Sequence, residues 1–186
     1  MKVLGIQTSP NEDGLTASMA LAGLKGAEAA GAETELIHLR KRDIRACLAC
    51  DQGWGICRTE HRCITEDEFQ AIREQMGAAD ALIISTPVYF GEPSEVTKSF
   101  FDRLRRCEFT LGEDSPIQGT PTIAIAAAGG SGGGTVTALE MLERYLRIIG
   151  MRGFDLITVT RFTRDHKLPM AEVAGRRLVE FRQAEA

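Results

Sequence analysis

The hydrophobic positions of this chain fall into five short apolar runs, with stretches of helical period between them. The runs are residues 3–6, 34–39, 81–86, 122–127 and 156–160. The third and fourth are apolar almost throughout, as expected for strands that are buried on both faces of a sheet. Strands that alternate with helices form parallel sheets with right-handed crossovers. We therefore predict an α/β fold, a doubly wound five-stranded parallel sheet with helices on both faces.

Five helices are predicted between and after these strands. They cover residues 16–30, 65–76, 94–106, 135–149 and 169–182. The second is expected to begin with a capping box made by Thr65 and Glu68, and the last to carry Pro169 in its first turn. No repeat and no linker interrupts the pattern, so residues 1–186 are expected to form a single domain.

Composition narrows the class of protein. Of the 186 residues, 44% are hydrophobic and 26% are charged, and the net charge is −4. These values are typical of a globular chain and give no support to a nucleic-acid partner. No apolar run has membrane-spanning length and no signal peptide is evident, so we expect a cytoplasmic protein without a membrane partner. Five cysteines in such a chain favour metal binding or redox chemistry over disulfides.

Ligands of doubly wound sheets bind beyond the carboxyl ends of the strands. Three loops lie there, at residues 7–18, 86–93 and 128–134. The first leads into a helix whose free N–H groups and positive dipole end attract phosphate. Ser9, Thr16 and Ser18 add hydroxyl donors. This loop is therefore either a phosphate site or an ordinary strand-to-helix turn.

The glycine-rich third loop fits neither common nucleotide motif. No G-x-G-x-x-G sequence follows the first strand, and no lysine precedes Thr135 as a P-loop requires. Gly129, Gly130 and the glycines at 132–134 instead leave bare N–H groups and room for a flat ligand. The alternative is that these glycines simply form a flexible connection.

With these loops in place, the sequence resembles the flavodoxin-like NAD(P)H-dependent FMN reductases, and within them the cysteine-bearing iron–sulfur flavoproteins. The matching residues are the Ser9-Pro10 loop with Thr16 and Ser18, the run at residues 86–91 with Lys98 and Asp102-Arg103 downstream, and the glycine loop. The resemblance implies a flavodoxin-like sheet with strand order 2-1-3-4-5. It also implies that FMN is bound by a set of residues from the three loops: Ser9, Asn11, Thr16, Ser18, Pro87, Val88, Tyr89, Phe90, Gly91, Gly129, Gly130 and Gly133.

By the same resemblance, the chain takes electrons from NAD(P)H and passes them to a small acceptor such as a quinone or free flavin, or through an iron–sulfur cluster. The flavin carries the chemistry, so no catalytic acid or base is named. A homodimer or homotetramer is implied. The alternatives are a non-enzymatic electron carrier and a sensing module that binds metal. Lys98, Asp102 and Arg103 are expected to form ion pairs on a helix surface or contacts at an interface.

The long connection at residues 40–64 is the second candidate site. It holds Cys47, Cys50, Cys57 and Cys63. Four thiolates can hold either a [4Fe–4S] cluster or zinc, and free or redox-active thiols are the third possibility. The family that the chain resembles has two residues between the second and third cysteines, whereas this chain has six. Cys107, outside the motif, is expected to be a packed thiol.

Overall fold

Five parallel strands form the centre of the protein in the computed structural model, which describes residues 1–185. They are β1 (Lys2–Gln7), β2 (Glu33–His38), β3 (Ala81–Tyr89), β5 (Pro121–Ala128) and β6 (Arg152–Thr160). Their spatial order is β2-β1-β3-β5-β6, which confirms the predicted order 2-1-3-4-5. A sixth strand, β4 (Glu92–Pro93), was not predicted and pairs antiparallel with the end of β3.

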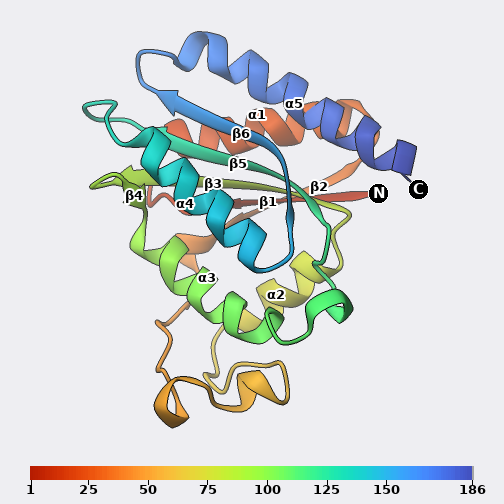
Figure 1. The fold of residues 1–186 in the computed structure, drawn as a ribbon. Helices are drawn as coiled ribbons and strands as arrows, with labels where there is room; N and C mark the ends of the chain where they lie inside the picture. The colour runs from red at the N-terminus through yellow and green to blue at the C-terminus, as the bar shows by residue number, and fades with distance from the viewer. Residues whose placement is uncertain (186) are drawn as a thin grey trace.

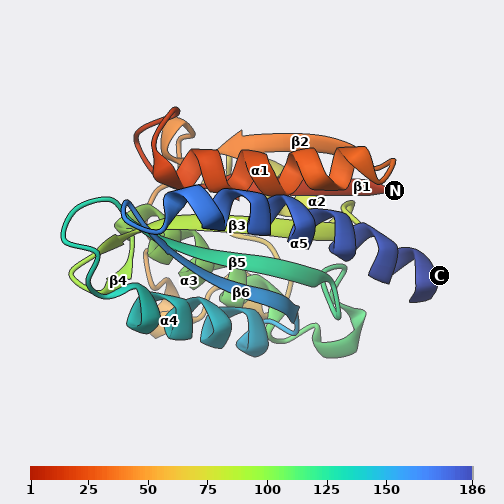
Figure 2. The same cartoon turned by 90° about the horizontal axis from the view of Figure 1, so that it is seen from above.

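Helices cover both faces of the sheet, as Figure 1 and Figure 2 show. On one face lie α1 (Leu15–Ala29) and α5 (Arg164–Glu185). On the other lie α2 (Phe69–Gly77), α3 (Glu95–Glu108) and α4 (Thr135–Ile148). Among residues 1–185, no helix is both long and apolar enough to cross a bilayer.

Alternating side chains of the strands divide the core into two layers. In β1, Leu4 and Ile6 pack with residues of α2, α3 and α4, while Val3 packs with residues of α1 and α5. In β3, Leu82 and Ile84 point to the first layer and Ile83 to the second. This two-sided burial explains why the predicted strands at residues 81–86 and 122–127 are nearly continuous apolar runs.

The predicted start of α2 was wrong. The helix begins at Phe69 rather than at Thr65, and no capping box forms. The Glu68 carboxylate instead accepts a hydrogen bond from the Asp43 backbone N–H at 2.7 Å, and Asp67 accepts from Phe69 N–H at 3.1 Å. Residues 65–68 therefore anchor the preceding connection instead of adding a turn of helix.

The predicted start of α5 was also wrong. The helix begins at Arg164, so Pro169 lies inside it rather than in its first turn. A turn of threonines starts the helix early: the Thr160 N–H donates to Thr163 Oγ1 at 2.9 Å, and the Lys167 N–H donates to the Thr163 carbonyl at 3.1 Å. Because proline lacks an N–H, Pro169 removes one backbone hydrogen bond near the helix start.

Candidate functional site

The loop from β1 to α1 is organised around Ser9. Its N–H donates to Gln7 Oε1 at 2.7 Å, and its Oγ accepts from the Asn11 N–H at 3.1 Å. The helix α1 starts behind Gly14 without a capping hydrogen bond from a side chain, and Thr16 lies buried in its first turn. The N–H groups at this helix end are therefore suited to receive an anion.

Ser18, in contrast, lies toward α5. Its Oγ is 3.5 Å from Arg164 Nη2, and the residue lines a groove with Leu21 and Leu168. Ser9 and Asn11 are thus hydrogen-bonded to each other in the loop before α1, Thr16 is buried in the first turn of that helix, and Ser18 contacts α5. A contact between Ser18 and phosphate stays a prediction.

The second loop is a tight hairpin between β3 and β4. Tyr89 pairs with Glu92, and the two residues between them, Phe90 and Gly91, have φ values of 53° and 81°. Positive φ at both central positions is typical of a type I′ turn. Phe90 is fully exposed and Tyr89 is 41% exposed, whereas Pro87 is buried in the sheet. A left-handed, solvent-exposed phenylalanine is strained, and such strain gathers at functional sites.

The glycine loop packs against this hairpin. A Cβ on Gly134 would lie 2.5 Å from the Cα of Gly91, and Thr137 Oγ1 donates to the Gly91 carbonyl at 2.7 Å. Gly129 and Gly130 are exposed beyond the end of β5. In Figure 1 and Figure 2 the three loops lie at the same edge of the sheet.

A cluster of buried hydroxyl groups lies beneath these loops and was missed by the sequence analysis. Thr97 Oγ1 on α3 is 2.8 Å from Thr8 Oγ1 and 2.9 Å from both Thr86 Oγ1 and Ser94 Oγ. Buried hydroxyls that satisfy one another fix the elements that carry them. The cluster thus ties the ends of β1 and β3 to the start of α3.

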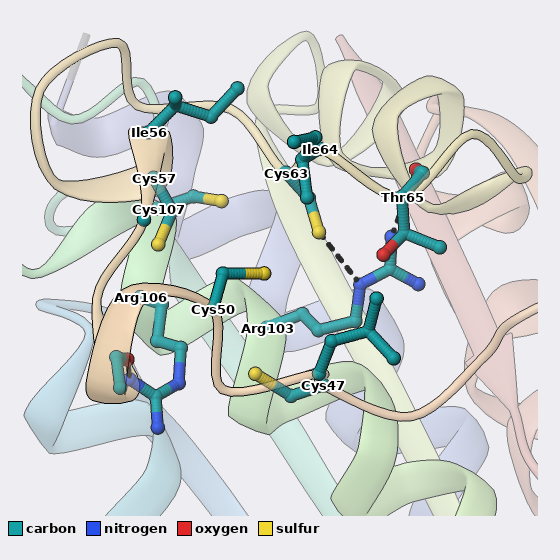
Figure 3. Close-up of a pocket in the computed structure, with 13 residues that line it drawn as sticks. Cys47, Cys50, Ile56, Cys57, Cys63, Ile64, Thr65, Arg103, Arg106 and Cys107 are labelled. Carbon is teal, nitrogen blue, oxygen red and sulfur yellow. Dashed lines mark hydrogen bonds between the residues drawn. The ribbon is translucent and has the colours of Figure 1, made fainter.

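The second candidate site is the cysteine segment, residues 40–64, which projects below α3 in Figure 1. All four predicted cysteines line one cavity with about 360 Å³ of empty space, part of it open to solvent. Figure 3 shows this cavity with Cys47, Cys50, Cys57 and Cys63 around it, and Cys107 of α3 at its wall. Cys107 is fully buried, as predicted, but its place beside the other thiols was not foreseen.

The backbone of the cysteine segment is strained. Ala49, Asp51, Gln52 and His61 have positive φ, and they are four of the five non-glycine residues with positive φ in residues 1–185. Such conformations persist only where the surroundings impose them. The segment is therefore held in a defined shape rather than as an ordinary loop.

The thiols around the cavity differ in acidity. Burial opposes ionisation of Cys63, but hydrogen bonds from Thr65 and Arg103 outweigh it, so the pKa of this thiol lies below its usual value. Burial raises the pKa of the Cys107 thiol to about 12. In the metal-free chain the surroundings therefore favour the thiolate of Cys63 and disfavour that of Cys107.

The spacing of these thiols also bears on the kind of metal site. Within the part of the chain that the structure describes, no three His, Cys, Asp or Glu side chains come close enough to share one metal ion. A structural zinc ion needs four ligands around a single centre. In a four-iron cluster each thiolate binds its own iron, so the cysteines stand around a larger space. The four thiols therefore line one cavity without forming a site for a single ion.

Two predictions on α3 had different outcomes. Lys98 and Asp102 form an ion pair at 2.5 Å on the helix surface, as predicted. Arg103 was wrongly placed at the surface: it is 1% exposed and forms an ion pair with Asp67 at 2.6 Å. The signal was present, because the helical period puts position 103 on the same face as the apolar residues Phe100 and Cys107.

Comparison with known proteins agrees with this geometry. The family model of NADPH-dependent FMN reductases matches residues 1–159. An iron–sulfur flavoprotein of Methanosarcina thermophila is 30% identical over 81% of this chain and 75% of its own length. An FMN-dependent NADH:quinone oxidoreductase of Polaromonas naphthalenivorans is 35% identical over 56% of this chain and 51% of its own. In fold, the chain is similar to an NAD(P)H:quinone oxidoreductase from Methanothermobacter marburgensis, with a TM-score of 0.76, 20% identity and coverage of 96% of both chains.

Proposed function

The chain belongs to the NADPH-dependent FMN reductase family and is an FMN-dependent oxidoreductase, and we propose that it takes electrons from NAD(P)H and delivers them to a small acceptor such as a quinone or free flavin. The observation that carries this proposal is the meeting of three loops at one edge of the sheet. One loop presents a helix start suited to phosphate, and the other two present aromatic side chains and bare backbone.

The FMN phosphate is bound at the start of α1. Ser9, Asn11 and Thr16 lie there together with N–H groups that no side chain caps. The other two loops, the β3–β4 hairpin and the glycine loop, pack against each other at Gly91 and Gly134. We assign the flavin ring to these loops, with the hairpin at residues 87–91 along one side and Gly129, Gly130 and Gly133 along the other.

When bound, FMN supplies hydride acceptance from a nicotinamide and electron transfer to the acceptor. The protein supplies position and electrostatics. Exposed N–H groups of the glycine loop and the start of α4 at Thr135 stabilise the negative charge that reduction adds to the ring. No side chain is needed as a general acid or base, so none is assigned.

The cysteine segment holds an iron–sulfur cluster in this proposal. Support comes from four thiols on one cavity, from the strained backbone around them and from the name of the Methanosarcina relative. A cluster would supply single-electron transfer beside the two-electron chemistry of the flavin. Cys47, Cys50, Cys57 and Cys63 are its assigned ligands.

The decisive experiment is one anaerobic preparation studied by absorption and by rapid mixing. The oxidised protein is expected to contain FMN, and either NADPH or NADH should bleach the flavin band within the time of steady-state turnover. Iron and acid-labile sulfide near four each per chain would support the cluster. If the protein binds FMN but neither NADPH nor NADH reduces it, the protein is an electron carrier reduced by another protein and not an NAD(P)H-dependent enzyme. Stoichiometric zinc would replace the cluster with a structural site.

We further propose a homodimer or homotetramer in the cytoplasm. Phe90 and Phe162 are exposed aromatics near the carboxyl edge of the sheet, where a second copy would cover them. Sedimentation of the wild type and of Phe90→Ser tests this assembly. A monomeric wild type would contradict it.

A further inference from the structure

Arg103 lies between the two ends of the cysteine segment. Its guanidinium forms two hydrogen bonds to the Asp67 carboxylate, at 2.6 and 2.8 Å. It also donates from Nη1 to the Arg45 carbonyl at 3.0 Å and from Nε to Cys63 Sγ at 3.3 Å. The Phe69 ring lies under it, with the Arg103 Cζ 4.2 Å from the ring centroid.

These contacts use the fixed geometry of a guanidinium. Its donors are directional and planar, so one side chain can hold a carboxylate, a carbonyl and a sulfur at the same time. A lysine ammonium is a compact point charge and cannot reproduce this fork. A buried charge is tolerated only when paired, and Asp67 provides the pairing.

The contacts join both arms of the segment. Arg45 precedes the first cysteine by two residues, and Cys63 is the last of the four. Asp67 also accepts from the Arg45 N–H at 2.9 Å, which closes the arms onto each other. In Figure 3 a dashed line marks the hydrogen bond from Arg103 Nε to Cys63 Sγ, two residues that line the cavity.

We propose that Arg103 is a positioning residue for the cysteine site: it fixes the Cys63 sulfur at the cavity, sets the separation of the two arms and places a positive charge beside the thiolates. The part that concerns the cluster rests on the proposed function, whereas the part that concerns the arms does not. A hydrogen bond to a ligating sulfur and a nearby cation favour the more reduced, more negative state of a cluster.

The first test measures amide hydrogen exchange in metal-free protein. In Arg103→Gln and Arg103→Lys, amides of residues 43–50 and 61–68 should exchange about tenfold faster or more, as loss of a hydrogen bond to a charged group implies. Arg105→Gln is the matched control, because Arg105 lies on the same helix, 5.2 Å from the Trp54 ring centroid, but makes none of the hydrogen bonds to Arg45, Cys63 or Asp67. In this variant the amides of residues 43–50 and 61–68 should exchange as in the wild type. Exchange unchanged in both Arg103 variants would overturn the proposal.

A second variant guards against simple unfolding. Removing Arg103 alone leaves Asp67 buried without its partner, so Arg103→Gln with Asp67→Asn keeps the site uncharged and similar in shape. This double variant should retain FMN and a cooperative thermal transition while its arms exchange faster than those of the wild type. Arms as protected as in the wild type would overturn the proposal.

The last readout concerns the metal. Iron and sulfide should fall in Arg103→Gln and in Arg103→Lys, and any cluster that remains should have a lower reduction potential in Arg103→Gln. If Arg103→Lys contained as much iron as the wild type, the directional hydrogen bonds of Arg103 would not be needed, and its positive charge would suffice. A wild type without iron would refute the cluster in the proposed function, and the exchange result would still decide whether Arg103 positions the arms.

Discussion

At the scale of single residues, Thr16 offers the sharpest test of the phosphate site. It is 4% exposed in the first turn of α1. Thr16→Val removes the hydroxyl and keeps the branched shape, so FMN should bind about 10- to 150-fold more weakly, the loss of one hydrogen bond to a charged group at about 1.5–3 kcal/mol. Fluorescence titration of the apoprotein with FMN measures this. Thr34→Val, near the opposite end of the sheet, is the control, and equal FMN affinity in both variants would refute the assignment.

The five cysteines should respond differently to substitution. Cys107→Ala is expected to leave the iron content unchanged, because Cys107 lies on α3, outside the segment that carries the four assigned ligands, and burial raises the pKa of its thiol to about 12. Cys50→Ala should abolish iron binding. Iron and sulfide analysis of anaerobically purified variants compares them. If Cys107→Ala loses iron as completely as Cys50→Ala, Cys107 belongs to the ligand set.

Residue chemistry explains which site residues the sequence could indicate. Hydroxyls before a helix and cysteines in a long connection are visible in the sequence as residue types. In the structure Ser9 lies in the loop before α1 and the four cysteines line one cavity, and their roles as ligands stay predictions. The partners of Arg103 cannot be identified in this way. Cys63 is 40 positions and Asp67 is 36 positions from Arg103 in the sequence, and they contact it only in the folded chain.

Between elements, the contact of the glycine loop with the hairpin should govern flavin binding. Gly134 has a φ of 79° and no room for a Cβ against Gly91. In Gly134→Ala the two loops must separate or the backbone must change, so FMN content should fall strongly while the sheet stays folded. Gly153→Ala on β6 is the control, because it lies outside the three loops and an added Cβ there meets nothing nearer than 3.9 Å. Absorbance of bound FMN after purification measures both, and normal FMN in Gly134→Ala would contradict this account.

The junction between the cysteine segment and α2 should weaken in acid. Burial opposes ionisation of Asp67, but hydrogen bonds from Arg103 and from backbone N–H groups outweigh it, so the pKa of this carboxyl is lowered. A lowered pKa contributes stability that is present above the unfolded value, about 3.9, and is lost as the pH falls through the folded value. Asp67→Asn should therefore be less stable than the wild type at pH 7, and the difference should narrow below about pH 4. Urea unfolding at several pH values measures this, and a constant difference would contradict it.

Element boundaries show where periodicity stops being informative. The apolar runs predicted every parallel strand: β1, β3 and β5 are buried on both faces, and the edge strands β2 and β6 still carry short apolar runs although they are partly exposed. The hydrophobic period did not predict where α2 starts, since Asp67 and Glu68 are recruited by residues of the cysteine segment. Nor did it predict β4, whose two residues form a strand only because Phe90 and Gly91 close a tight turn.

Across the whole molecule, α3 connects the two candidate sites. Its first turn carries Thr97 of the hydroxyl cluster beneath the loops, and its later turns carry Arg103 and Arg106 at the cysteine cavity. Because α3 follows β3 in the middle of the sheet, its start lies beneath the three loops and its later turns lie beside the cysteine segment. The alternation of strands and helices let the sequence predict that the three loops lie at one edge of the sheet. It gave no information on the position of the cysteine segment, which contacts α3 through side chains such as Arg103.

The face opposite α3 depends on a close crossing of α1 and α5, and α5 lies beyond the residues that the family model matches. A Cβ on Gly175 would lie 1.8 Å from the Gly23 carbonyl oxygen, and one on Gly26 would lie 1.8 Å from the Glu172 carbonyl oxygen. Alanine normally stabilises a helix relative to glycine by about 0.5–1 kcal/mol. In Gly175→Ala the clash should outweigh this gain and destabilise the protein by about 1–3 kcal/mol.

For a chain of this size, that loss corresponds to a fall in the thermal midpoint of about 2–4 °C per kcal/mol, which calorimetry resolves. Gly153→Ala on β6 is the control, because its Cβ would meet nothing nearer than 3.9 Å. FMN content should stay unchanged in both variants, since the crossing lies away from the three loops. A midpoint for Gly175→Ala at or above that of the wild type would mean that α5 shifts easily on α1, and that the backbone contact of these helices does not fix their packing.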